Sequence, residues 1–274
     1  MTSPRAEALE KLLCTVDALR EPDGCPWDRK QTVPSMAAFV IEEGFELVEA
    51  IEKGDDVASC EELGDLLMVL AMICRIADEG GRFDIGAAAE AVHEKLVRRH
   101  PHVFGDAVAE SAEEVLTNWE AIKREEREQA EVDSSALAGV PVALPALLRA
   151  ARSCEKAVTA GFRWSNAAGA WAKLEEEVGE LTEALEPVDL EASLRPKLEG
   201  ELRERVEHEL GDVLLAGAFL GSYLGIDPER ACRQALRRFE SRFRSMEGDL
   251  EAPLADHSLV ELIAAWERAK AAQA

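Results

Sequence analysis

Four acidic side chains in the first half of the chain have a spacing that could hold a metal ion. Glu43 and Glu46 form one i,i+3 pair, and Glu62 and Asp65 form a second. Residues three positions apart share one face of a helix, so each pair can aim two carboxylates at one point. The second pair opens an apolar run, Leu66 to Ile73, where an unpaired carboxylate is costly. The pattern therefore predicts a hard cation held between two helices.

The second half of the chain repeats this pattern. Glu42-Glu43-x-x-Glu46 matches Glu176-Glu177-x-x-Glu180, and Glu62-x-x-Asp65 matches Glu209-x-x-Asp212. Three flanking motifs recur in the same order: Gly24-x-x-Trp27 with Gly161-x-x-Trp164, Lys95-x-x-x-Arg99 with Arg238-x-x-x-Arg242, and Trp119-x-x-x-Lys123 with Trp266-x-x-x-Lys270. Such repetition indicates the duplication of one module.

The ligand types indicate which metal would bind. Each module offers four carboxylates and no histidine at the matching positions, and oxygen ligands favour Mg²⁺ or Mn²⁺ over zinc. Di-iron helical bundles use Glu-x-x-His instead. A lone Glu-x-x-Glu is usually a solvated helix face, but the repetition favours a metal site. Because protein-bound magnesium usually bridges to phosphates, the pattern points to a phosphate ester or anhydride substrate.

The basic motifs fit the same kind of substrate. Arginine forks onto phosphate oxygens, so the basic residues become candidates for binding a polyphosphate, although alone they are more often surface charges. Each tryptophan of the Trp-x-x-x-Lys motifs either packs in the core or stacks near a nucleobase.

The composition favours an all-α protein of two modest domains. The chain has 274 residues, of which 47% are hydrophobic, 31% charged and 5% aromatic. The formal net charge of −24 disfavours nucleic acid and anionic membranes as partners. The six cysteines include no CxxC pair, which favours reduced core thiols and a cytoplasmic location. We see no signal peptide and no apolar run long enough to span a membrane.

The pattern of apolar residues and turn signals predicts ten helices. They cover residues 5–20, 35–53, 57–79, 84–100, 111–131, 145–159, 168–186, 196–224, 228–247 and 257–272. Pro101 ends the fourth helix, and HPHVFGD follows as a loop, in which we assign His100 and His102 no metal. The domains are then residues 1–131 and 145–274, joined by a linker at 132–144.

Several strings resemble the MazG family of nucleoside triphosphate pyrophosphohydrolases. They are GCPWDRKQT, IEEGFELVEAI, EELGDLL and RRHPHVFGD in the first half, and GFRW, EEEVGEL, ELGDVLL and FESRF in the second. The resemblance implies tandem all-α MazG modules whose helical bundles are completed by homodimerisation. It also implies Mg²⁺-dependent hydrolysis of ribo- and deoxyribonucleoside triphosphates to the monophosphate and pyrophosphate, with broad specificity and a house-cleaning role.

The resemblance also implies roles for individual residues. The metal ligands would be Glu43, Glu46, Glu62, Asp65, Glu177, Glu180, Glu209 and Asp212. The nucleotide contacts would be Lys95, Arg98, Arg99, Trp119 and Lys123 in the first module, and Lys173, Arg238, Arg242, Trp266 and Lys270 in the second. Glu42 and Glu176, beside the ligands, would orient the attacking water.

The sequence departs from the family pattern at three places. Val33 stands where the family usually has histidine, His208 replaces a glutamate, and the NxKF motif reads Leu236-Arg237-Arg238-Phe239. The last two changes favour the first module as the competent one, whereas the resemblance to the family, in which the second module is often the more active, favours the second. Two other functions stay open: a narrower nucleotide or phosphoribosyl-nucleotide pyrophosphohydrolase, and a non-catalytic helical scaffold or regulator.

Overall fold

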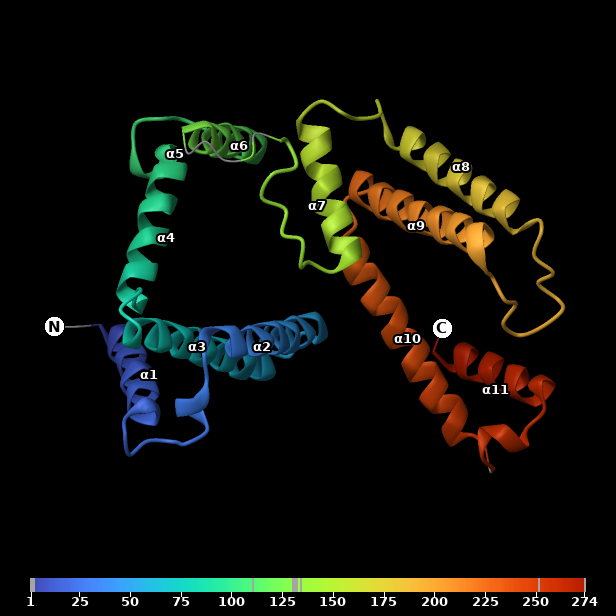
Figure 1. Ribbon diagram of the computed structural model, residues 1–274, viewed down its shortest axis with the longest axis horizontal. Coiled ribbons are helices and arrows are strands. Elements are labelled where there is room, and N and C mark those ends of the chain that lie inside the picture. Colours follow the sequence, from blue (N-terminus) through green and yellow to red (C-terminus); the bar gives the residue numbers. More distant parts are fainter. Residues whose placement is uncertain (1–2, 110, 130–132, 134, 251, 274) are drawn as a thin grey trace. The chain divides into compact units, whose positions relative to one another are not determined.

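The computed structural model describes residues 3–109, 111–129, 133, 135–250 and 252–273. Within these residues the secondary structure is helical and contains no strand (Figure 1), which confirms the all-α prediction. The chain divides into two compact units, Met1–Glu126 and Arg127–Ala274, called unit 1 and unit 2 below. The predicted boundary between 131 and 132 lies outside the described residues.

Unit 1 contains helices α1 to α6. Their bounds are α1 Pro4–Arg20, α2 Val33–Lys53, α3 Asp56–Glu79, α4 Ile85–Arg99, α5 Pro101–Phe104 and α6 Ala112–Gln129, which runs a few residues past the end of the unit. A 3₁₀ turn, η1, covers Asp28–Lys30. The prediction of a loop over HPHVFGD was wrong, because Pro101 opens the short helix α5. Proline suits the first position of a helix, where its missing N–H would have no partner.

Unit 2 contains helices α7 to α11. Their bounds are α7 Ala146–Thr159, α8 Ala167–Leu185, α9 Gly200–Tyr223, α10 Pro228–Gly248 and α11 Leu259–Ala272, with a 3₁₀ turn, η2, over Leu254–Asp256. Helix α9 begins four residues later than predicted, at the left-handed Gly200 (φ 56°) that follows Pro196 in the chain. The connection from α8 is correspondingly longer than the turn between α2 and α3.

A short turn builds the helical hairpin that carries the first acidic pairs. Helix α2 starts with a capping box between Thr32 and Ser35 and ends at Gly54, whose φ of 71° suits glycine. Asp55 caps α3 by accepting hydrogen bonds from the N–H groups of Val57 and Ala58. Because only two residues separate the helices, α2 and α3 pack side by side (Figure 1).

The core of unit 1 lies where α1, α2 and α3 meet. Its buried residues are Val16, Met36, Val69, Ala71, Met72 and Ile76. In unit 2, α8 packs on α9, α7 and α10 pack on α9, and α11 packs on α10, where Met246, Ala265 and Ala269 are buried. Both units therefore hold an α-helical hairpin, α2–α3 or α8–α9, against further helices.

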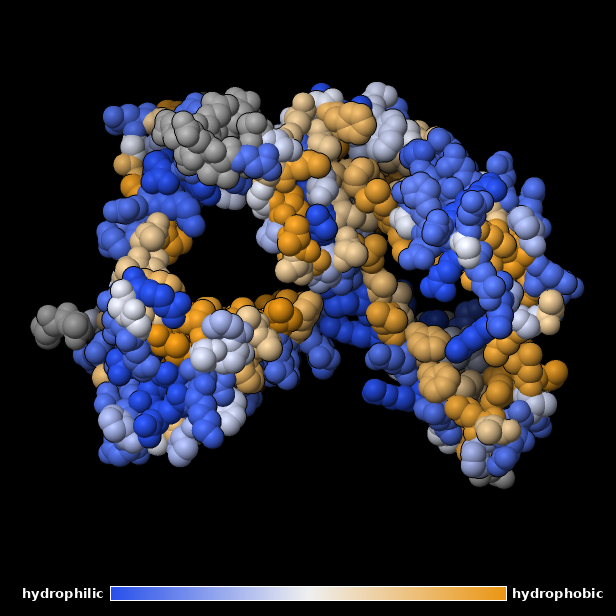
Figure 2. Space-filling view, viewed as in Figure 1, coloured by the Kyte–Doolittle hydropathy of each residue, from blue (hydrophilic) through white to orange (hydrophobic). Residues whose placement is uncertain are grey.

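Hydrophobic side chains also gather on the surface. Figure 2 shows them over α2 and α3 and over α10 and α11. The matching second helices of the two hairpins each expose three leucines: Leu63, Leu67 and Leu70 on α3, and Leu210, Leu214 and Leu215 on α9. No single helix among the described residues is long and apolar enough to cross a membrane, although α9 and α10, bent by 108°, pass that test together.

Candidate metal centre

The hairpin of unit 1 brings three of its four predicted ligands together. Glu43 on α2 meets Glu62 and Asp65 on α3, with one carboxylate oxygen of each within 4.8 Å of the others. Glu46 lies outside this group of three, but its charge still acts on Glu43 and Glu62. We call Glu43, Glu62 and Asp65 the unit 1 cluster.

The electrostatics of the unit 1 cluster are those of crowded like charges. Loss of solvent raises the pKa of Glu43, and the neighbouring carboxylates of Glu46, Asp65 and Glu42 raise it further. The pKa of Glu62 is raised for the same two reasons. Like charges at this range disfavour the ionised form unless a cation joins them.

The hairpin of unit 2 forms a second group. Glu177 and Glu180 on α8 meet Glu209 on α9, again with oxygens within 4.8 Å of one another. Glu177 is only 6% exposed, and its Oε2 is buried without a hydrogen-bond partner. Loss of solvent, followed by the charge of Glu177, raises the pKa of Glu180. We call Glu177, Glu180 and Glu209 the unit 2 cluster.

The fourth predicted ligand of unit 2, Asp212, lies outside the unit 2 cluster. Its Oδ2 is 3.4 Å from Nε2 of His208, the residue that replaces a glutamate of the family pattern. The two are one helical turn apart, a contact that the i,i+4 spacing makes possible. The substitution thus gives Asp212 a partner that the matching Asp65 lacks.

Both clusters fit a hard divalent cation. Each offers three carboxylates from two helices, with no sulfur or imidazole ligand in the group, and such donors suit Mg²⁺ or Mn²⁺. The unpartnered Oε2 of buried Glu177 gives the strongest support, because a buried carboxylate oxygen is costly without a partner.

Lysine occupies one side of the unit 2 cluster. Lys173 Nζ lies 2.6 Å from Glu177 Oε1 and 2.8 Å from Glu176 Oε1. These contacts raise the pKa of Lys173. Glu176, predicted to orient water, is therefore paired with Lys173, whereas Glu42 in unit 1 is exposed.

The predicted basic residues of unit 1 are engaged with other side chains. Arg98 Nε and Arg99 Nη2 lie 2.7 and 2.6 Å from the carboxylate of Glu126, which lowers the pKa of Glu126 to about 2. Lys123 Nζ lies 4.4 Å from the ring centre of Trp119, and Lys95 is exposed. Arg98, Arg99, Trp119 and Lys123 thus gather between α4 and α6.

The matching residues of unit 2 are arranged differently. Trp266 packs against buried Met246 and lies 5.4 Å from Phe239, measured between ring centres. Among the described residues, none pairs with the guanidinium groups of Arg238 or Arg242, and Nε of Arg242 is buried without a hydrogen bond. Lys270 lies 3.7 Å from Glu267.

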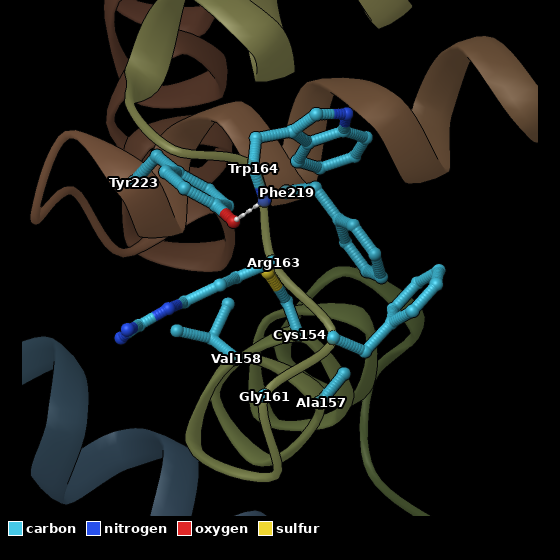
Figure 3. Close-up of a pocket in the computed structure, with 9 residues that line it drawn as sticks. Cys154, Ala157, Val158, Gly161, Arg163, Trp164, Phe219 and Tyr223 are labelled. Atoms are coloured by element: carbon cyan, nitrogen blue, oxygen red, sulfur yellow. Dashed lines mark hydrogen bonds between the residues drawn. The ribbon is translucent and has the colours of Figure 1, made fainter.

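The Gly161-x-x-Trp164 motif forms a corner that leads into α8. The N–H of Trp164 donates to the hydroxyl of Tyr223 at 2.9 Å, and a Cβ on Gly169 would lie 2.6 Å from the Trp164 ring. Beside this corner lies a cavity of about 230 Å³ (Figure 3), lined by Cys154, Ala157, Val158, Gly161, Phe162, Arg163, Trp164, Phe219 and Tyr223. Burial raises the pKa of the Cys154 thiol.

In unit 1, a buried arginine anchors the matching corner. Arg20, at the end of α1, donates to both carboxylate oxygens of Glu79 at 2.7 and 2.6 Å and to the backbone carbonyls of Asp28 and Gln31. These contacts tie the loop carrying Trp27 to the end of α3. Sequence patterns did not single out Arg20, because its partners lie on other elements.

Comparisons with known proteins agree with the repeated architecture. The model of the MazG nucleotide pyrophosphohydrolase domain matches residues 31–104 and 168–246. A nucleoside triphosphate pyrophosphohydrolase/pyrophosphatase MazG of Thermotoga maritima is 39% identical over 264 residues, 95% of each chain. A nucleoside triphosphate pyrophosphohydrolase of Escherichia coli is 39% identical over 241 residues, 87% of each chain. The chain therefore belongs to the MazG nucleotide pyrophosphohydrolase family and carries its domain twice.

Proposed function

We propose that the protein hydrolyses nucleoside triphosphates to the monophosphate and pyrophosphate, with Mg²⁺ or Mn²⁺ as cofactor. The reaction is the one for which the two relatives are named. The observation that supports the site is the pair of three-carboxylate groups, one on each helical hairpin. The broad substrate range, the house-cleaning role and the cytoplasmic location remain predictions.

The acidic residues would hold the cofactor. Glu43, Glu62 and Asp65 would bind it in unit 1, and Glu177, Glu180 and Glu209 in unit 2, with Glu46 and Asp212 as further ligands. A bound divalent cation polarises phosphoryl oxygens and generates hydroxide at neutral pH. Glu42 and Glu176 would orient the water for attack on the α-phosphorus.

The basic residues would hold the triphosphate. Arg238 and Arg242 of unit 2 have guanidinium groups without a carboxylate partner among the described residues, so they can fork onto phosphate oxygens without breaking an ion pair. Arg98 and Arg99 of unit 1 must first leave Glu126. Lys95, Lys123, Lys173 and Lys270 would neutralise the charge that gathers on the leaving pyrophosphate.

The two tryptophans differ in what they offer a base. Trp266 packs against the α10–α11 core, which favours a role in packing. Trp119 has cationic partners, Arg99 at 5.9 Å and Lys123 at 4.4 Å from the ring centre, and stays a candidate for stacking on a nucleobase.

We propose further that the protein is a homodimer. Leu63, Leu67 and Leu70 on α3, like Leu210, Leu214 and Leu215 on α9, are exposed between 39% and 55%. An exposed apolar face of this kind is typical of a surface that another helix covers. The matching hairpin of a second copy would complete a four-helix bundle.

A product analysis tests the reaction. The protein is incubated with Mg²⁺ and a panel of nucleoside and deoxynucleoside triphosphates, and pyrophosphate and orthophosphate are measured separately. We expect pyrophosphate from several members of the panel. Orthophosphate without pyrophosphate would place cleavage at the γ position and contradict the proposal. Turnover of one nucleotide alone would instead favour the narrower pyrophosphohydrolase.

A further inference from the structure

The two clusters differ in their internal counter-ions. In unit 2, the ammonium of Lys173 holds one oxygen of Glu177 at 2.6 Å and leaves the buried Oε2 without a partner. In unit 1 the position four residues before Glu43 is Phe39, which packs against Trp27 with ring centres 5.8 Å apart. Among the described residues, no cation forms an ion pair with Glu43, Glu62 or Asp65.

The basic side chains show the reverse distribution. Arg98 and Arg99 of unit 1 share the carboxylate of Glu126. In the described part of unit 2, no carboxylate pairs with Arg238 or Arg242. Unit 1 therefore holds an acidic cluster without a cationic partner and arginines that are already paired. Unit 2 holds a cluster paired with Lys173 and arginines that no described carboxylate pairs with.

We propose that Lys173 is an internal counter-ion of the unit 2 cluster, and that it moves from Glu177 to the triphosphate when a divalent cation binds. The long, flexible lysine side chain can exchange one anion for another without moving α8. Cation and triphosphate then bind cooperatively in unit 2, since each favours the same position of Lys173. Unit 1, with Phe39 in place of lysine, binds the cation without this coupling. The inference rests on the proposed function, because it requires both clusters to bind a divalent cation.

The experiment measures Mn²⁺ binding to the full chain by the electron paramagnetic resonance signal of free Mn²⁺. Glu62→Ala disables the unit 1 cluster, so the remaining binding reports unit 2. In this background and without nucleotide, we expect Lys173→Met to tighten Mn²⁺ binding about fivefold, the size of a partly exposed ion pair. Lys197→Met is the matched control, because Lys197 is exposed on the α8–α9 connection and carries the same charge. We expect it to change the affinity less than about twofold.

A second arm measures the coupling. A triphosphate with a methylene bridge between its α- and β-phosphates is titrated with and without Mn²⁺ in the same background. Mn²⁺ should raise the affinity for this analogue by some factor in the background protein, and we expect Lys173→Met to reduce that factor by about threefold or more. In the Glu209→Ala background only the unit 1 cluster can bind Mn²⁺. There, Lys173→Met should change neither the Mn²⁺ affinity nor the factor by which Mn²⁺ tightens binding of the analogue.

A third variant, Lys173→Arg, still tests the proposal if Lys173→Met does not fold. Lys173→Arg retains the charge and can form a two-point pair with Glu177, so Mn²⁺ binding should weaken rather than tighten. Unchanged Mn²⁺ affinity in the Lys173 variants would contradict the proposed role of Lys173 as a counter-ion, but it would not contradict the proposed metal centre. An absence of Mn²⁺ binding in both backgrounds would contradict both proposals, the metal centre and the role of Lys173.

Discussion

Replacing Arg20 by alanine tests how the corner of unit 1 is anchored. The Arg20 side chain is 6% exposed and that of Glu79 is 33% exposed, with Nη2 and Oε2 2.6 Å apart. Arg20→Ala removes this two-point pair and the donors to the carbonyls of Asp28 and Gln31. The expected result is a less stable unit 1 whose loop at Trp27 is loosened.

The structure sets the size of this loss. Removing one partner of a fully buried ion pair costs about 3–5 kcal/mol. Glu79 keeps some water contact and stays within 3.6 Å of Arg75, so we expect about 2–3 kcal/mol for Arg20→Ala. In a unit of this size that corresponds to a fall of about 6–12 °C in Tm.

The assay is urea unfolding followed by circular dichroism, with hydrogen exchange of α2 and α3 to assign the loss to unit 1. Arg82→Ala is the control, because Arg82 is exposed in the turn that follows α3. The double variant Arg20→Met/Glu79→Leu should recover most of the stability, since it leaves no unpaired charge. A loss below about 0.5 kcal/mol in the free energy of unfolding for Arg20→Ala would show that Arg20 does not anchor this corner.

The pH dependence gives a second check on the same pair. The hydrogen bonds from Arg20 lower the pKa of Glu79 below its ordinary 4.5. A carboxylate with a lowered folded-state pKa stabilises the protein above its unfolded pKa, and this contribution is lost as pH falls through the folded value. The difference in the free energy of unfolding between the wild type and Arg20→Ala should therefore be largest at pH 7 and should decrease below about pH 4.5.

Three further variants test other parts of the chain. Glu126→Gln should lower the free energy of unfolding at pH 7 by about 1 kcal/mol. Because the pKa of Glu126 is about 2, the difference from wild type in urea unfolding should narrow as pH falls from about 4.5 toward 2. The same variant releases Arg99 and should tighten binding of inorganic triphosphate to unit 1, measured by calorimetry in a Glu209→Ala background. Gly169→Ala should lower Tm, because the new Cβ would meet the Trp164 ring at 2.6 Å; an unchanged Tm would contradict the packing described. Leu67→Lys should shift the sedimentation coefficient from dimer to monomer, and an unchanged value would count against α3 as the dimer surface.

The sequence predicted the helices and the duplication well, because capping residues, glycines and apolar periodicity are local signals. It missed α5, since Pro101 reads equally as a helix stop and a helix start. It also placed the start of α9 too early, in a charged stretch where no side chain caps the helix.

For the candidate site, the sequence could predict only which carboxylates share a helix face. An i,i+3 spacing shows that two carboxylates share a face, but the packing of two helices decides which three oxygens converge, and this left Glu46 and Asp212 outside the groups. The contact of Lys173 with Glu177 follows an i,i+4 spacing and could have been predicted. The contacts of Arg20 with Glu79 and of Arg99 with Glu126 join distant parts of the chain, and no local pattern indicates them.

We propose that the two carboxylate clusters are the sites at which nucleoside triphosphates are cleaved to the monophosphate and pyrophosphate. The most direct measurement is the pyrophosphate released per triphosphate consumed, for the wild type and for the double variant Glu62→Ala/Glu209→Ala, with Arg82→Ala as a control. We expect one pyrophosphate per triphosphate for the wild type and the control, and a loss of turnover of at least about a hundredfold in the folded double variant. Wild-type turnover in the double variant, or orthophosphate as the product, would contradict it.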